Sequence, residues 1–127
     1  MIQQVRRSAR VFKTVWFAKA TRKALIADNE LCLAIRQVML GQADDSGGGV
    51  FKKRLDKNRS RSIILAKGGR YWVYEYLFAK KDRANITYGE LVEFRELAKT
   101  YEMLTDERIN QATRENLWTE ICNGTET

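Results

Sequence analysis

Apolar residues in the first third of the chain follow a strand pattern and then a helical one. Residues 10–17, RVFKTVWF, are rich in β-branched and aromatic side chains and predict a short strand, and the helix formers in residues 18–25, AKATRKAL, predict a short helix behind it. Asp28 is a suitable N-cap for a longer helix that Gly41 ends. The apolar positions of that helix recur at helical spacing: Leu31, Ile35, Val38 and Met39.

The middle of the chain has the pattern of consecutive strands. Residues 42–49, QADDSGGG, consist largely of turn formers and predict a loop. Residues 50–55, 62–67 and 70–79 predict three strands, joined by the turn formers DKNRS and by Gly68-Gly69. Two consecutive glycines supply the positive φ angles of a two-residue hairpin turn, so we predict an antiparallel meander.

The last of these strands carries large apolar side chains on both faces. One face has Trp72, Tyr74, Tyr76 and Phe78, and the other has Tyr71, Val73, Glu75 and Leu77. A central strand covered by helices on one side explains this pattern. Single-stranded nucleic-acid binders also use exposed aromatic residues, and we favour the core interpretation over that alternative.

The C-terminal third returns to a helical period. Thr87 and Glu90 have the spacing of a capping box before a helix that reaches Tyr101, and Thr105 or Asp106 begins a second helix predicted to extend through Ile121. The patterns together predict an α+β fold, in which N-terminal helices pack on a small antiparallel β-sheet of about four strands and helices follow at the C-terminus. We expect one domain over residues 1–127, with its core in residues 10–101 and a helical extension in residues 102–127.

Composition narrows the classes of protein that fit. No apolar run reaches the length of a membrane span and no signal-peptide core follows the N-terminus, so the expected location is the cytoplasm. The chain contains no histidine, which excludes a histidine-based catalytic triad or zinc site. Cys32 is expected to be a small core residue and Cys122 to lie near a loose terminus, neither with a redox role.

Charge is unevenly distributed along the chain. The net charge is +7, and residues 50–83 hold eleven Lys or Arg against three acids, whereas residues 84–127 hold four against nine. A cationic middle suits a polyanionic partner, although a solvated basic face would look the same. Cations stand at the ends of three adjacent strands, which a meander can bring together. Neighbouring like charges lower the pKa of a lysine, so this pattern favours a site that handles phosphate.

Two motifs, taken in order, resemble the RelE/ParE toxin superfamily and its RelE-type, phage-associated branch. They are GGGVFKKRL and YLFAKKDRANIT, the first followed by a strand led by arginine and the second by an acidic helix. The resemblance implies a bacterial toxin that cuts messenger RNA in the ribosomal A site and is silenced by a cognate antitoxin. Its implied partners are therefore mRNA, the ribosome with its RNA, and the antitoxin, with no membrane and no cofactor or metal.

The resemblance also implies site residues. Lys52 and Lys53, with Arg54, match the basic pair that serves as charge stabiliser and general base, and Arg61 matches the arginine that opens the next strand. Lys81 and Arg83, with Lys80 beside them, match the cationic cluster that clamps the scissile phosphate. Tyr88 lies near a family tyrosine, with Thr87 as the alternative match. Arg59 belongs to Asn58-Arg59-Ser60-Arg61-Ser62, where relatives often have Gly-Gly-Tyr-Arg.

The implied reaction is attack of a ribose 2′-OH on the adjacent phosphate, for which Lys, Arg and Tyr can serve as base, charge stabiliser and acid. Two alternatives stay open. A ParE-like topoisomerase inhibitor of the same fold would act by protein contact and would not need the cations. A nucleic-acid-binding accessory protein would use the cations without cutting, and its affinity would fall steeply with salt.

Overall fold

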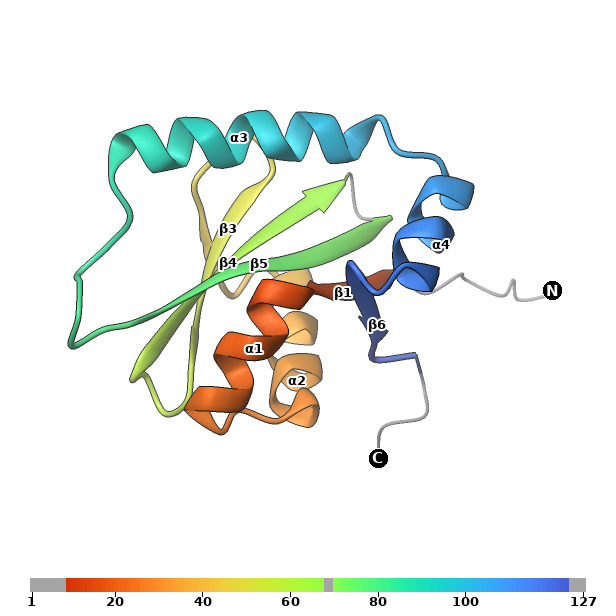
Figure 1. Cartoon of the computed structure of the whole chain (residues 1–127). Coiled ribbons are helices and arrows are strands. Elements are labelled where there is room, and N and C mark those ends of the chain that lie inside the picture. Colours follow the sequence, from red (N-terminus) through yellow and green to blue (C-terminus); the bar gives the residue numbers. More distant parts are fainter. Residues whose placement is uncertain (1–8, 68–69, 124–127) are drawn as a thin grey trace, which may run out of the picture.

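The computed structural model of the chain describes residues 9–67 and 70–123, which form one layered arrangement of helices and strands (Figure 1). The predicted turn at Gly68-Gly69 lies outside the described residues. The elements in chain order are β1 (Arg10–Thr14), α1 (Val15–Ala24), α2 (Asp28–Met39), β2 (Asp44–Asp45), β3 (Val50–Leu55), β4 (Ser60–Lys67), β5 (Tyr71–Ala79), α3 (Tyr88–Glu102), α4 (Asp106–Arg114) and β6 (Trp118–Ile121).

A six-stranded sheet in the order β2-β3-β4-β5-β1-β6 forms the centre of the described fold. The α+β class is confirmed, and so is the antiparallel meander of β3, β4 and β5. The sheet has six strands where about four were expected, and it is mixed, because β1 pairs with β5 in parallel, with Arg10 opposite Tyr71. The helices between β1 and the meander allow this pairing, since a parallel connection must cross from one end of the sheet to the other.

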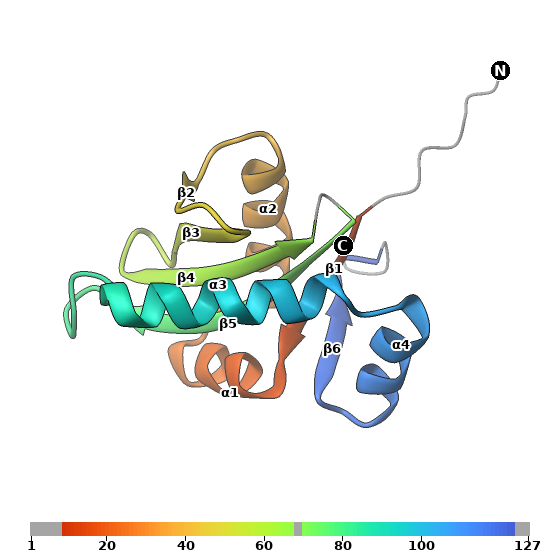
Figure 2. The same ribbon diagram turned by 90° about the horizontal axis from the view of Figure 1, so that it is seen from above.

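Helices cover both faces of the sheet rather than one. Figures 1 and 2 show α3 lying across one face, with α1 and α2 on the other side. On the α1/α2 side the core contains Phe17, Leu31, Ile35, Leu55, Ile64 and Tyr74, and on the α3 side it contains Val50, Ile63, Leu65, Phe78 and Ala98. The core interpretation of the aromatic strand is confirmed, because Tyr71, Trp72, Val73 and Tyr74 are all buried.

Local capping explains where two helices begin. Thr14 ends β1 because its Oγ1 accepts a hydrogen bond from the backbone N–H of Phe17, 3.0 Å away, which starts α1 inside the strand predicted over residues 10–17. The capping box of Thr87 and Glu90 is confirmed at the start of α3. The predicted N-cap Asp28 is instead the first helical residue of α2, and its carboxylate pairs with Lys13 at 2.7 Å.

The C-terminal segment corrects the predicted second helix. α4 ends at Arg114, and residues Trp118–Ile121 form β6, which pairs antiparallel with β1. Asn116 adopts a positive φ of 61°, a conformation that ends a helix. Trp118 and Ile121 are buried. A strand at this position buries both apolar side chains and also provides hydrogen-bond partners for the edge of β1.

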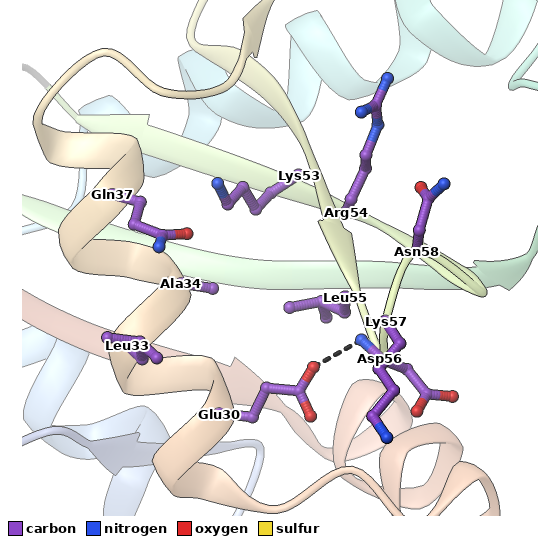
Figure 3. Close-up of a pocket in the computed structure, with 10 residues that line it drawn as sticks. All are labelled: Glu30, Leu33, Ala34, Gln37, Lys53, Arg54, Leu55, Asp56, Lys57 and Asn58. Atoms are coloured by element: carbon purple, nitrogen blue, oxygen red, sulfur yellow. Dashed lines mark hydrogen bonds between the residues drawn. The ribbon is translucent and has the colours of Figure 1, made fainter.

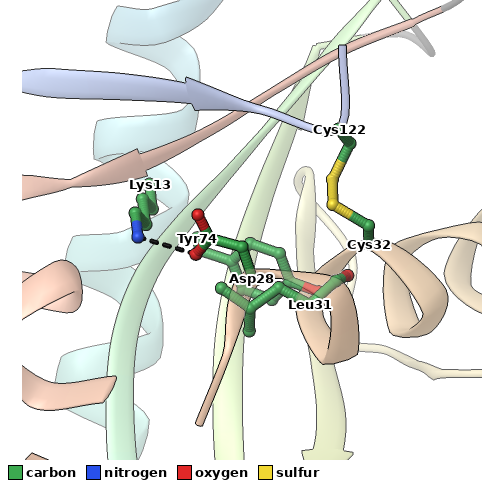
Figure 4. The surroundings of a disulfide bond; sticks show 6 residues. All are labelled: Lys13, Asp28, Leu31, Cys32, Tyr74 and Cys122. Atoms are coloured by element: carbon green, nitrogen blue, oxygen red, sulfur yellow. Dashed lines mark hydrogen bonds and ion pairs between the residues drawn. A yellow bond between two sulfur atoms is a disulfide. The ribbon is translucent and has the colours of Figure 1, made fainter. Parts of the chain in front are cut away.

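A disulfide joins Cys32 of α2 to Cys122 just after β6 (Figure 4). The expectation that Cys32 lies in the core is confirmed, since Cys32 is only 9% exposed. The expectation that Cys122 lies near a loose terminus is wrong, because β6 pairs with β1 directly before it and the disulfide ties it to α2. None of the helices described is long and apolar enough to cross a membrane.

Candidate functional site

Alternation along β3 divides its cations between the two faces of the sheet. Lys52 Nζ donates a hydrogen bond to Asn85 Oδ1 at 3.0 Å, whereas Lys53 Nζ donates to the backbone oxygen of Gln42, after α2, at 2.8 Å. In Figure 3, Lys53 is directed toward α2 and Arg54 away from it. Lys52 and Arg54 therefore share the α3 face, and the structure does not bring Lys52 and Lys53 together.

Arg61 lies on the same face as Arg54 and directly opposite it across the β3–β4 pair. Its Nη1 donates to the backbone oxygens of Asn58 and Ser60, at 3.0 and 3.3 Å, so the β3–β4 turn holds the guanidinium in place. On its other side Arg61 is paired with Phe78 of β5. Like charges directly opposite each other are destabilising, and an anion bound between them would relieve the repulsion.

Arg83 reaches the same face from the loop that follows β5. Its guanidinium lies over the ring of Phe78, 5.6 Å from the centroid, and its Nη1 donates to the hydroxyl of Tyr76 at 3.3 Å. Its Nε donates to the backbone oxygen of Asn85. Phe78 thus lies between Arg61 and Arg83. We call Lys52, Arg54, Arg61 and Arg83 the cationic cluster.

Glu90 compensates one charge of the cationic cluster. The carboxylate binds the Arg83 guanidinium and also accepts from the backbone N–H of Thr87. These contacts, with the hydrogen bonds of Arg83 foremost, lower the pKa of Glu90 from 4.5 to about 2. Glu90 is therefore ionised at neutral pH, and Arg83 is less available to an outside anion than Arg54, which is exposed.

The remaining predicted cations lie in turns at the end of the sheet where β3 and β5 finish. Arg59 forms an ion pair with Asp56 at 2.8 Å, and its backbone oxygen accepts from the N–H of Lys80 at 2.8 Å. Lys80 and Lys81 are exposed in the turn after β5. Tyr88 begins α3 and is 74% exposed. These four residues lie in segments that adjoin the cationic cluster along the chain: Arg59 precedes β4, Lys80 and Lys81 follow β5, and Tyr88 follows the loop that carries Arg83.

Lys53 lines a separate pocket of about 330 Å³ between α2 and β3 (Figure 3). Burial, followed by the charge of Arg54, lowers the pKa of Lys53. The sequence predicts that neighbouring cations lower the pKa of a lysine in this region, but for Lys53 burial is the larger cause. The lysine with the lowered pKa therefore faces away from Arg61 and Arg83.

Two polar residues of the site were not singled out by sequence reasoning for a site role. Asn85 accepts from both Lys52 Nζ and the backbone N–H of Ile86, so it joins β3 to the loop before α3. For Glu90 the sequence pattern predicts only a role in the helix cap. The motif DRAN preceding a capping box was the available signal, but the contacts depend on how the loop folds back onto β3.

Residues 9–121 match the family model described as the RelE toxin of the RelE / RelB toxin-antitoxin system. The chain belongs to the RelE toxin family. This match covers nearly the whole chain and includes every member of the cationic cluster, in agreement with the resemblance inferred from the motifs. No curated protein matches the chain.

Membership of the RelE family identifies the chain as a toxin-type protein of a toxin-antitoxin system, and the family description names a RelB antitoxin as the partner of the toxin. In residues 9–67 and 70–123, no group of three or more His, Cys, Asp or Glu side chains is positioned to hold a metal ion. Beside the cations, the described polar groups at the cationic cluster include Asn85, the hydroxyl of Tyr76 and the carboxylate of Glu90.

Proposed function

We propose that this RelE-family protein is an endoribonuclease that cuts messenger RNA, acting on ribosome-bound message without a metal ion. The observation that carries the proposal is the position of Lys52, Arg54 and Arg61 on one face of the sheet, with Arg83 beside them. Cations held in fixed positions by backbone and side-chain contacts stabilise charge that develops on a phosphate in the transition state.

Arg54 and Arg61 are the proposed phosphate ligands, because they are cross-strand neighbours and their mutual repulsion favours an anion between them. Lys81, exposed in the adjacent turn, would contact the same phosphate. Arg83, bound to Glu90, would act as a positioning residue for the loop before α3. Arg59 and Lys80 would bind flanking phosphates.

Lys52 is the proposed proton acceptor. In its neutral form the amine takes the proton of a ribose 2′-OH, and the 2′ oxygen then bonds to the adjacent phosphorus. The bond from phosphorus to the 5′ oxygen breaks, and the phenol of Tyr88 gives that oxygen a proton. The products are a 2′,3′-cyclic phosphate and a 5′-hydroxyl. Lys53 faces the α2 pocket, so we give it no contact with this phosphate.

The proposed partners are the ribosome, its mRNA and a cognate antitoxin. The ribosome would align the 2′-OH with the phosphate, a contribution that a small site made of Lys, Arg and Tyr needs, since proximity and orientation supply much of an enzyme's rate enhancement. The antitoxin follows from the RelB partner named in the family description.

Lys52→Ala and Lys53→Ala form a matched pair of variants for the test, because the two residues are adjacent in β3 but face opposite sides of the sheet. Translating ribosomes are mixed with purified protein, and new 5′-hydroxyl ends on the mRNA are mapped for protein with and without prior EDTA treatment, the chelator being removed before mixing because ribosomes need Mg²⁺. We expect cleavage that prior EDTA treatment of the protein does not affect, a fall of about 10²–10⁴-fold in rate for Lys52→Ala, and little change for Lys53→Ala. Equal losses in both variants would contradict the assignment of Lys52.

A non-cleaving nucleic-acid binder is the second candidate, favoured by the pairing of Arg83 with Glu90, which removes one free cation from the site. It predicts RNA affinity that falls steeply with salt and no new RNA ends. A ParE-like inhibitor would differ from both, because the joint variant Lys52→Ala, Arg54→Ala, Arg61→Ala would still arrest growth.

A further inference from the structure

Trp16, in the first turn of α1, has one open aromatic face. Its ring stacks on Tyr76 with centroids 5.2 Å apart and planes inclined by 23°. The residue is nevertheless 50% exposed. Because an indole has two faces and Tyr76 covers one of them, the exposed half belongs largely to the opposite face. A large apolar surface of this kind is open to stacking.

Tyr76 connects this open face to the cationic cluster. Its hydroxyl accepts from Arg83 Nη1 at 3.3 Å, and its ring lies 5.9 Å from that of Phe78, over which the Arg83 guanidinium lies. Trp16 is thus separated from Arg83 by a single aromatic ring. A strand of nucleic acid whose phosphate lies at the cluster would have neighbouring bases within reach of the indole.

The surface of α1 beyond Trp16 is basic. Lys19 and Lys23 stand three and seven residues after Trp16, on the same side of the helix, and both are exposed. The sequence of α1 contains no acidic residue, and neither lysine forms an ion pair with any residue that the structure describes. Aromatic side chains that stack bases beside cations that follow the backbone are the general means of binding single strands.

We propose that α1 is an extension of the RNA site, in which Trp16 stacks one nucleobase and Lys19 and Lys23 bind successive phosphates of a single strand leaving the cationic cluster. The ligand class is single-stranded RNA, and the inference rests on the proposed ribonuclease function. The alternative occupant, a segment of the antitoxin, would need acidic groups opposite Lys19 and Lys23 and is separated by the experiment below.

The probe is a short single-stranded RNA with 2′-methoxy riboses, which can bind but lacks the attacking hydroxyl. Fluorescence anisotropy compares the wild type with Trp16→Ala, Trp16→Phe and the control Met103→Ala, another exposed apolar residue. We expect Trp16→Ala to weaken binding about tenfold and Trp16→Phe to retain most of the affinity. Met103→Ala should bind as the wild type does, and thermal melting checks that each variant is folded.

Three further measurements test the stacking by Trp16 and the phosphate contacts of Lys19 and Lys23. In a series of RNAs that each lack one base, the position of the missing base is moved along the strand. For one of these RNAs the affinities of the wild type and of Trp16→Ala should be equal. Lys19→Ala and Lys23→Ala should each reduce the slope of log affinity against log salt by about 0.7. A 5-iodouridine RNA should photocrosslink to Trp16, located by mass spectrometry.

Distinct outcomes separate the two proposals. If Trp16→Ala binds RNA as tightly as the wild type while Arg61→Ala loses affinity, the α1 extension is wrong and the cationic cluster stands. If the wild type binds RNA no better than Arg61→Ala, both proposals fail. If Trp16→Ala leaves RNA binding unchanged but abolishes neutralisation by the antitoxin, α1 is a protein interface instead.

Discussion

Glu90 holds Arg83 through two hydrogen bonds across the loop between β5 and α3, from Nη2 to Oε1 at 2.5 Å and from Nη1 to Oε2 at 3.1 Å. The same carboxylate accepts from the backbone N–H of Thr87 and completes the capping box of α3. One side chain therefore fixes the start of a helix and the direction of an arginine at the candidate site.

Replacing this carboxylate with Glu90→Gln should lower stability at neutral pH. The folded-state pKa of Glu90 is about 2, below its ordinary value of 4.5, so ionised Glu90 stabilises the fold above about pH 4.5 and that contribution is lost as the pH falls toward 2. Thermal melting of wild type and variant should therefore show a gap at pH 7 that closes in acid.

Glu93→Gln is the matched control, because Glu93 lies on the same helix and is exposed. Its melting temperature should follow that of the wild type at every pH. A Glu90→Gln gap that is constant across the acid range would show that the ion pair with Arg83 does not stabilise the fold.

The Cys32–Cys122 disulfide should contribute a large part of the stability. It closes 90 residues and ties β6 to α2, and loss of a native disulfide from a small domain typically costs about 2–5 kcal/mol. Urea unfolding should show this difference between oxidised wild type and the double variant Cys32→Ser, Cys122→Ser. Dithiothreitol should lower the free energy of unfolding of the wild type to about that of the double variant and leave the value of the double variant unchanged. Two free thiols in the untreated protein would refute the disulfide.

Local sequence signals sufficed for much of the fold. The core position of β5 and the Thr87–Glu90 capping box depend on neighbouring residues alone, and both were predicted correctly. The predicted division of β5 into two faces is wrong beyond Glu75, because the irregularity there puts Tyr76 and Phe78 on the face opposite Trp72 and Tyr74. β6 and the disulfide were missed because each depends on a partner distant in the chain. Trp118 is buried as a strand residue only because β1 offers an edge beside it, about 100 residues earlier in the sequence.

The sequence names candidate residues for the site but does not say which face of the sheet each occupies. The family resemblance matches Lys52 and Lys53 to one basic pair, whereas the two-residue period of a strand sends them to opposite sides. Asn85 and Glu90 gain their roles from the conformation of the loop after β5. Trp16 meets Tyr76 only after β1 and β5 pair in parallel, a contact that no local pattern indicates.

Close packing around Gly49 predicts a strong effect of a single methyl group. Gly49 and Gly41 have nearly equal positive φ angles, 84° and 88°. A Cβ at Gly49 would lie 3.1 Å from the backbone oxygen of Ala66 and 3.3 Å from the Cβ of Ala98, whereas one at Gly41 would meet nothing within 4 Å. Gly49→Ala should therefore be less stable than Gly41→Ala by about 1–3 kcal/mol in urea unfolding. Both variants have the strain of an alanine at positive φ, but only Gly49→Ala also crowds its neighbours. Equal losses would mean that α3 shifts to accommodate the methyl group.

Glu75 should be replaceable with a gain in stability. It lies half-buried at the irregularity in β5, and its Oε1 accepts from the Tyr101 hydroxyl at 2.7 Å. Burial raises the pKa of Glu75 above 4.5, with the hydrogen bond from Tyr101 opposing this rise. A raised pKa means that the folded state favours the protonated carboxyl, so the contribution of Glu75 is present below about pH 4.5 and is lost as the pH rises through the folded value. Glu75→Gln keeps an acceptor for Tyr101 without a charge. It should melt at a higher temperature than the wild type at pH 7 and at nearly the same temperature at pH 4, and a lower melting temperature at pH 7 would show that the ionised carboxylate stabilises this face.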